Sequence, residues 1–116
     1  MKTLDPQTLA KGQTFNCPVE ATLAVIGGKW KVMILYHLLD DGVHRFAELR
    51  RKIPGISERM LTQQLRELEA DGVVHREVYA QVPPKVEYSI TAYGETLRPV
   101  SEALCRWGVK HMERHS

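Results

Sequence analysis

The segment His44 to Gly72, HRFAELRRKIPGISERMLTQQLRELEADG, predicts two helices joined by a tight turn. The first helix is indicated by three apolar residues at helical spacing, Phe46, Leu49 and Ile53. Pro54 and Gly55 end this helix, because proline disfavours helical geometry in the residue before it and glycine favours a turn. A second helix is therefore expected to start just after Gly55.

Ser57 is the predicted N-cap of that second helix, and Glu58 suits the positive end of the helix dipole. One stripe of the helix is apolar and must face a core: Leu61, Leu65 and Leu68. The opposite stripe is polar and consists of Arg59, Thr62, Gln63 and Arg66. In a helix-turn-helix the second helix enters the DNA major groove, where arginine pairs with guanine and glutamine with adenine. The alternative is that this polar stripe is only a solvated helix face.

Composition limits the other possibilities. The chain has 116 residues, 43% of them hydrophobic, which suits one domain spanning 1–116 with a continuous core. The net charge of +2 says little about partners. Between residues 45 and 59, however, beside the predicted second helix, the sequence has only two acidic residues but five basic ones: Arg45, Arg50, Arg51, Lys52 and Arg59. Such a patch can neutralise DNA phosphates, or it can serve only solubility.

No membrane or export segment is expected. The longest apolar run, Val32 to Leu39, is far shorter than the ~20 residues that a membrane helix needs. The polar N-terminus lacks the apolar stretch of a secretory signal, so we expect a cytoplasmic protein without membrane association. Cys17 and Cys105 are the two cysteines, which is consistent with a reducing compartment and gives no disulfide framework.

Three segments precede the helix-turn-helix. Residues 1–16 are polar and are interpreted as an N-terminal arm, either disordered or packed on a partner subunit. A helix is predicted from Cys17-Pro18, where proline suits the first helical position, to Gly27-Gly28. Lys29 to Leu39 is apolar almost all round and predicts a buried central helix, within which His37 is interpreted as a core or boundary residue.

After Gly72 the hydrophobic period changes to that of strands. Val74 to Tyr79 and Val86 to Ile90 alternate and should pair as a hairpin, whose connecting loop contains Pro83-Pro84 and ends at Lys85. A helix-turn-helix followed by a hairpin, here residues 44–90, predicts a winged helix in a mainly α fold. Gln81 and Lys85 are the candidate DNA contacts of the wing, unless the loop is only a solvent-exposed tip.

A last helix is predicted over residues 91–115, capped by Thr91. It has one long apolar stripe, formed by Leu97, Val100, Leu104 and Trp107. A small winged-helix core has little room for such a helix, so the stripe is expected to pack on a second subunit. The alternative is that it folds back on its own domain. A dimer agrees with the paired half-sites that DNA readers of this size bind.

These segments together resemble the HxlR-type family of winged helix-turn-helix transcriptional regulators, which are MarR-like. The resemblance rests on CPVEATLAVIGGKWK from Cys17, RFAELRR from Arg45, GISERMLTQQLRELEADG from Gly55, VPPKVEYSIT from Val82, and Trp107-Gly108. It implies a promoter-binding homodimer, repressor or activator, held by the N-terminal segment and the terminal helix. It also implies that two copies of the second helix occupy successive major grooves.

The resemblance assigns DNA-binding roles to Arg45, Ser57, Arg59, Thr62, Gln63, Arg66 and Lys85, with Arg45 as a phosphate contact. Some relatives of this family sense electrophiles or oxidants through a cysteine at the place of Cys17. Others have that cysteine without an assigned sensing role. A redox or small-molecule effector is therefore one option, and Cys17 as a packing residue is the other. Cys105 is expected to be buried beside the apolar stripe, where burial would raise its pKa.

Two other functions compete with that of a DNA-binding regulator. One is a winged-helix adaptor that binds another protein, which would lack salt-dependent binding to duplex DNA. The other is an enzyme, which is disfavoured because the sequence has no glycine-rich phosphate loop, nucleophile elbow or convergent catalytic set. No cofactor is expected. His111 and His115 are four residues apart on a helix, but ordinary surface histidines explain them better than a metal site.

Overall fold

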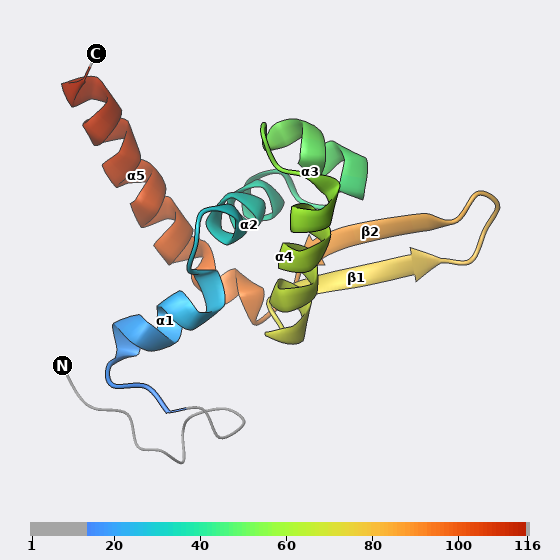
Figure 1. Cartoon of the computed structure of the whole chain (residues 1–116), viewed down its shortest axis with the longest axis horizontal. Helices are drawn as coiled ribbons and strands as arrows, with labels where there is room; N and C mark the ends of the chain where they lie inside the picture. Colours follow the sequence, from blue (N-terminus) through green and yellow to red (C-terminus); the bar gives the residue numbers. More distant parts are fainter. Residues whose placement is uncertain (1–13, 116) are drawn as a thin grey trace.

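The structure is a computed structural model that describes residues 14–115. Within this range the chain is mostly helical with a two-stranded antiparallel hairpin, as a winged helix-turn-helix requires (Figure 1). The elements in chain order are α1 (Pro18–Ile26), α2 (Trp30–Asp41), α3 (Phe46–Lys52), α4 (Glu58–Ala70), β1 (Val74–Tyr79), β2 (Lys85–Ile90), the 3-10 helix η3 (Gly94–Leu97) and α5 (Arg98–Arg114). The predicted fold class is confirmed. Most of the predicted N-terminal arm lies outside the described residues.

The core lies where α2, α3 and α4 meet the inner end of the hairpin. Its most deeply buried side chains are those of Ile34, Leu49, Ile53, Leu61, Leu65, Leu68, Val73 and Val74. Five of these were predicted to face inward from the helix-turn-helix: Leu49, Ile53, Leu61, Leu65 and Leu68. Phe46, also predicted to face inward, is half-buried and packs against this core. The expectation for the central helix, Lys29 to Leu39, holds only in part, because Tyr36 is exposed while Lys31 is buried. The helix also continues beyond Leu39 to Asp41. The apolar composition of this segment therefore predicted a buried helix, but it did not predict that a charged residue would be buried with it.

The hairpin projects from this core. Its register runs from the pair Val74↔Ile90 at the base to Tyr79↔Lys85 near the tip. His44 adds a bridge at the base, since its backbone N–H donates to the Tyr88 carbonyl and its own carbonyl accepts from Tyr88. Val74 and Tyr88 are buried and the outer half of β1 is exposed, so the base is anchored and the loop extends away (Figure 1).

The start of the last helix differs from the prediction. Thr91 does accept a hydrogen bond from the Gly94 amide through its hydroxyl oxygen at 2.9 Å, and it donates to the Gly72 carbonyl at 2.6 Å. The Thr91 hydroxyl therefore satisfies the first amide of η3, whose N-cap position is Tyr93, and it does not cap an α-helix. Helix α5 begins only at Arg98. Pro99 stands in the first turn of α5, the helical position in which a missing N–H and a fixed φ are tolerated.

Gly94 marks a close approach between the hairpin base and η3. A Cβ at this buried position would overlap the carbonyl oxygen of Val73 and press on the side chain of Ile90. We expect Gly94→Ala to lower the free energy of unfolding by about 1–3 kcal/mol, as other overpacked sites do. Chemical denaturation measures this effect. Exposed Ala92 provides the control, because Ala92→Ser should stay within about 0.5 kcal/mol of the wild type.

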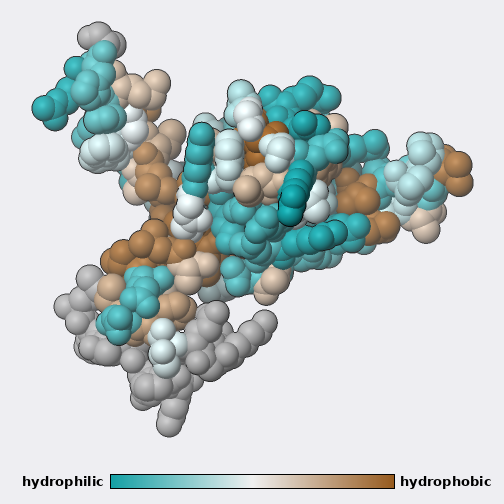
Figure 2. Space-filling model, in the orientation of Figure 1, coloured by the Kyte–Doolittle hydropathy of each residue, from teal (hydrophilic) through white to brown (hydrophobic). Residues whose placement is uncertain are grey.

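Helices α1 and α5 diverge from the core and expose apolar surface on their facing sides (Figures 1 and 2). The exposed apolar side chains on these two helices are Val19, Leu23, Leu104, Trp107, Val109 and Met112. Leu97 and Val100 of the predicted dimer stripe are instead half-buried and pack against the core of the same protomer. The stripe left uncovered in the protomer is therefore its outer half, at Leu104 and Trp107.

None of the described helices is by itself long and apolar enough to cross a membrane. Only α1 and α2 taken together reach the required length, and the two helices are bent by 79° where they meet.

Candidate nucleic-acid interface

Local sequence fixes the position of α4. The Ser57 hydroxyl oxygen accepts a hydrogen bond from the Met60 amide at 3.1 Å, as predicted for an N-cap. Gly55 occupies the turn with φ +90°, a backbone conformation that side chains other than glycine rarely adopt. Because Leu61, Leu65 and Leu68 are fully buried, the opposite side of α4 must face outward.

The outward side of α4 is an open groove of about 570 Å³, lined by Glu58, Arg59, Thr62, Gln63, Arg66 and Glu67. The four predicted reading residues thus share one surface. Neither Arg59 nor Arg66 forms an ion pair with any residue that the structure describes. Two unpaired guanidinium groups on an exposed helix face are available to a base edge or a phosphate.

Two residues to which the sequence analysis gave no role support this surface, Glu67 on its edge and buried Lys31 beneath it. The Lys31 ammonium, from α2, is 2.7 Å from Oε1 of Glu67 on α4. Oε2 of Glu67 accepts a hydrogen bond from Nε2 of Gln63 at 3.2 Å. The hydrogen bond from Lys31, and secondarily that from Gln63, holds the pKa of Glu67 below its usual value. The contact between Gln63 and Glu67 could have been predicted from their i, i+4 spacing. No feature of the sequence indicated that Lys31 contacts α4.

The predicted basic patch is smaller than the sequence suggested. Arg50 forms an ion pair with Glu58 at 3.1 Å, and the Lys52 ammonium donates to Asp41 at 2.7 Å and to Nε2 of His44 at 2.8 Å. Two of the five basic side chains of the patch are therefore paired within the protomer, in ion pairs exposed on its surface. Arg45 lies at the start of α3, where its backbone N–H donates to the Glu48 carboxylate at 2.7 Å and leaves the guanidinium exposed.

Lys85 lies near the tip of the wing, as the sequence predicted, but it is not extended into solvent. Its ammonium sits 4.4 Å from the centre of the Tyr79 ring and 3.7 Å from a carboxylate oxygen of Glu87. A hydrogen bond with Glu87 also raises the pKa of the Tyr79 hydroxyl. The connecting loop from Gln81 to Pro84 is fully exposed beyond this cluster. Tyr79 and Glu87 therefore hold the Lys85 ammonium close to the hairpin.

Arg76 is a further basic residue that the sequence interpretation did not assign. A second groove, of about 290 Å³, runs between α4 and the hairpin and is lined by Thr62, Leu65, Arg66, Glu69, Arg76 and Tyr88. Arg76 pairs with Tyr88 in the strand register and has no ion-pair partner within residues 14–115. The sequence did contain an indication of this placement, because the period-2 pattern puts Arg76 on the same face of β1 as Val74.

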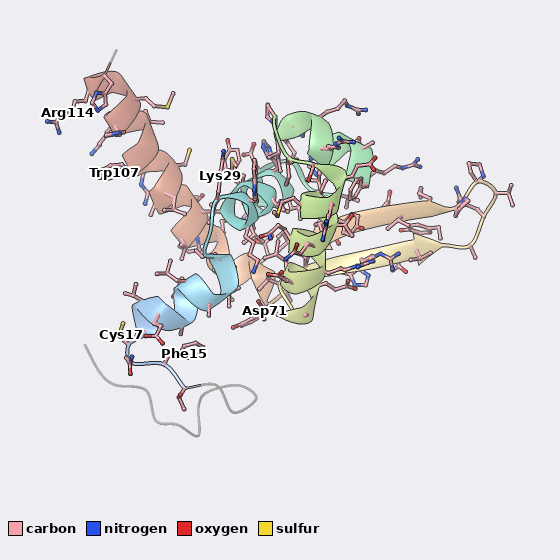
Figure 3. All side chains as sticks on the ribbon, in the orientation of Figure 1. Phe15, Cys17, Lys29, Asp71, Trp107 and Arg114 are labelled. Carbon is pink, nitrogen blue, oxygen red and sulfur yellow. The ribbon has the colours of Figure 1, made fainter. Side chains whose placement is uncertain are left out.

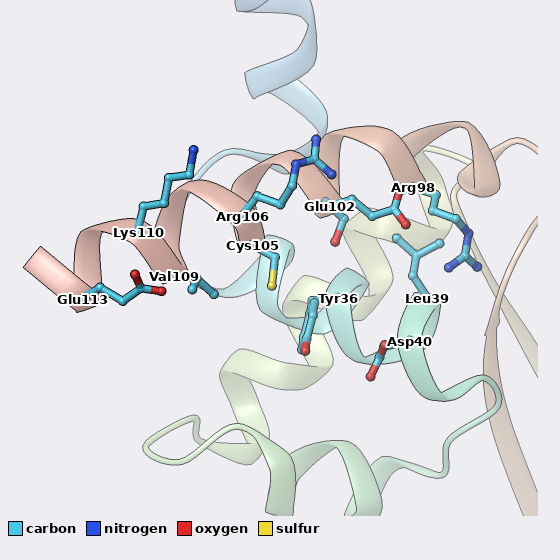
Figure 4. Close-up of a pocket in the computed structure, with 11 residues that line it drawn as sticks. Tyr36, Leu39, Asp40, Arg98, Glu102, Cys105, Arg106, Val109, Lys110 and Glu113 are labelled. Carbon is cyan, nitrogen blue, oxygen red and sulfur yellow. The ribbon is translucent and has the colours of Figure 1, made fainter.

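Both cysteines are exposed in the protomer. Cys17 is the N-cap residue of α1, at the outer end of that helix and away from α4 (Figure 3). The expectation that Cys105 is buried was wrong: Cys105 is exposed, because it lies about 100° around the helix from Leu104 of the apolar stripe. Cys105 instead lines a groove of about 620 Å³ between α2 and α5 with Tyr36 and Val109 (Figure 4). No group of three or more potential metal-ligating side chains is found in the part of the chain described.

Comparison with known proteins assigns this architecture to a family. Residues 25–116 match the model of the HxlR-like helix-turn-helix family. The chain belongs to the HxlR-like family. Among curated members, it is 62% identical over 99 residues to the uncharacterized HTH-type transcriptional regulator YdeP of Bacillus subtilis, in a match that spans 85% of this chain and 77% of YdeP.

Solved structures of similar proteins agree with the fold of this HxlR-like chain. The redox regulator HypR in its oxidized form is 63% identical, with a TM-score of 0.78 over 81% of this chain and 96% of HypR. Diamide-treated YodB from B. subtilis is 36% identical, with a TM-score of 0.66 over 81% of this chain and 93% of YodB. The predicted HxlR-type winged-helix regulator is thereby confirmed, and the relatives cited are named as regulators rather than enzymes.

Proposed function

We propose that this chain is a homodimeric, sequence-specific regulator of transcription that acts on promoter DNA in the cytoplasm, as repressor or activator. The observation that supports it is the outward surface of α4, where Arg59 and Arg66 are exposed beside Thr62 and Gln63. In this arrangement α4 of each protomer enters a major groove, and these four side chains face the base edges.

Phosphate contacts flank the reading helix in this proposal. Arg45 at the start of α3 and Lys85 of the wing are the candidates from the sequence, and Arg76 joins them from β1. Ser57 accepts the capping hydrogen bond, so its hydroxyl hydrogen remains available to a phosphate oxygen. Contacts of this kind position a protein on DNA without reading its sequence.

Salt dependence tests the proposal against the protein-interaction adaptor. A dimer that neutralises about six to ten phosphates should lose roughly 10³-fold or more in affinity between about 50 and 200 mM salt. We expect this fall when a fluorescent duplex selected by the protein from a random pool is titrated across that range. An adaptor would select no duplex and would bind any DNA only weakly, at every salt concentration.

The dimer is proposed to form through α1 and α5. Leu104 and Trp107 are exposed on α5, and Val19 and Leu23 are exposed on α1, so the two helices present one apolar surface (Figure 2). Apolar surface of this extent is typical of a protein interface rather than of an isolated monomer. A two-fold axis through this surface would place two α4 helices on successive half-sites.

Cys17 is proposed as the residue through which an oxidant or electrophile alters DNA binding. Its thiol is exposed at the N-terminus of α1, within reach of a dissolved reagent, and α1 belongs to the proposed dimer surface. HypR is named a redox regulator, and YodB was crystallised after treatment with diamide. The effector would then act by shifting the dimer geometry and with it the half-site spacing.

Diamide treatment with glutathione tests this role. Wild-type protein should change its operator affinity by about 5- to 150-fold, the usual size of a coupling between two sites, and dithiothreitol should reverse the change. Cys105→Ser should respond as the wild type does, and Cys17→Ser should not respond. Unchanged affinity of wild-type protein in which mass spectrometry confirms the modified Cys17 would leave this cysteine as a packing residue.

A further inference from the structure

Lys31 is a charged residue within the core. It lies on α2, and only 11% of its side-chain surface is exposed. An ammonium group in such a place is costly unless a carboxylate compensates it. The compensating carboxylate is that of Glu67, at 2.7 Å, and it belongs to the DNA-reading helix α4 rather than to a neighbouring turn of α2. The pair therefore joins the core helix to the outward face of α4.

Glu67 divides its two oxygens between two partners. Oε1 faces Lys31 and Oε2 accepts from the side-chain amide of Gln63, so the carboxylate is held from both ends. With 44% of its side-chain surface exposed, Glu67 also lines the groove on the outward side of α4. A carboxylate facing DNA repels phosphates, and the ammonium of Lys31 offsets that charge.

Gln63 is distinguished by this contact from the other reading residues. Within the described chain, the side chains of Arg59, Thr62 and Arg66 form no hydrogen bond or ion pair. The Gln63 amide donates one hydrogen to Glu67, which leaves its other hydrogen and its carbonyl oxygen for a base edge. A glutamine amide must present nitrogen and oxygen in the right order to pair with adenine, so a fixed orientation selects a base.

We propose that Lys31 is a positioning residue for base recognition: acting through Glu67, it fixes the amide of Gln63 and thereby sets the base pair that Gln63 reads. The inference rests on the proposed function, in which Gln63 faces the major groove. It adds a residue of the core, one that touches no DNA, to the determinants of sequence preference.

The experiment uses the full-length protein and a duplex that the wild type selects from a random pool. Each variant is titrated against that duplex, all its single-base-pair substitutions and a random duplex. Gln63→Ala first identifies the base pair at which preference disappears. Glu67→Gln keeps an oxygen for Lys31 but presents an NH₂ group that cannot accept from Gln63. Lys31→Met removes the ammonium. Lys52→Met is the matched control, because it breaks a 2.7 Å ion pair with Asp41 away from α4.

We expect Glu67→Gln and Lys31→Met to reduce preference at the Gln63 base pair by roughly tenfold, the scale of one bidentate base contact. Their affinities for random DNA should move in opposite directions. Glu67→Gln removes a negative charge and should bind more tightly, whereas Lys31→Met leaves that charge uncompensated and should bind more weakly. Adding Glu67→Gln to Gln63→Ala should cause no further reduction at that base pair. Lys52→Met should keep every base preference.

Three results would overturn the inference. If Glu67→Gln and Lys31→Met alter the affinity for all duplexes by one factor, Lys31 only docks α4 on the core. If Gln63→Ala changes no base preference while Arg59→Ala does, the inference fails and the proposed function stands. If the wild type selects no sequence, both fail. Should Lys31→Met not fold, Glu67→Gln still decides the question, because it keeps the lysine contact.

Discussion

Replacing Trp107 with aspartate is expected to dissociate the dimer and to abolish tight operator binding. Trp107 is 67% exposed in the protomer, at the uncovered outer half of the α5 stripe. A buried interface tryptophan commonly contributes at least about 2 kcal/mol, and a two-fold axis counts it twice. A loss of about 4 kcal/mol weakens dimerisation roughly 10³-fold. Since the second half-site then binds independently, operator affinity should fall by about 10²-fold or more.

Analytical ultracentrifugation at micromolar concentration, with DNA titration of the same samples, measures both effects. Val109→Asp is the matched control. Val109 is also an exposed apolar residue of α5, but it lines the groove toward α2 (Figure 4). At two positions beyond Trp107, it lies roughly 160° around the helix from that residue. It should leave the dimer intact. Wild-type protein that sediments as a monomer would refute the interface, and so would a Trp107→Asp dimer of unchanged strength.

Local patterns were enough to predict the helix-turn-helix and the wing. Ser57, the turn at Gly55 and the leucine stripe of α4 each depend on residues within one or two helical turns, and the structure has each of them in its predicted role. The hairpin followed from period-2 alternation and its proline-containing loop. Short-range geometry of this kind is encoded in neighbouring residues, so sequence alone could specify it.

Contacts between distant segments could not be predicted in this way. The sequence suggests a free charge at Lys52, but Asp41 and His44 hold it. Lys31 lies within the apolar helix predicted from the sequence, although its partner is 36 positions away on α4. Cys105 neighbours an apolar stripe and is nevertheless exposed, because a helix places adjacent residues about 100° apart. Periodicity therefore identifies a face without identifying what covers it.

The second large effect is expected at the reading face itself. Arg59→Ala and Gln63→Ala should each remove about 1–3 kcal/mol of discrimination between the selected operator and a scrambled duplex, roughly 5- to 150-fold. The two together should reduce operator binding to the non-specific level. Neither side chain packs in the core, since both lie exposed on the outward groove of α4. Melting temperatures should therefore stay near that of the wild type, so the defect would be one of recognition.

Lys85→Ala provides the contrast, because a wing lysine that contacts a phosphate reads no base. It should lower the affinity for the operator and for the scrambled duplex by the same factor. It should also reduce the slope of log affinity against log salt by about 1 for each phosphate that the variant no longer neutralises. Lys85→Ala also removes the contact of the ammonium with the Tyr79 ring. Tyr79→Phe keeps that ring and removes only the hydroxyl. Fluorescence titration of both duplexes at several salt concentrations separates base reading from phosphate binding. Unchanged specificity in both Arg59→Ala and Gln63→Ala would show that another surface reads the DNA, and α4 would then lose its assignment as the recognition helix.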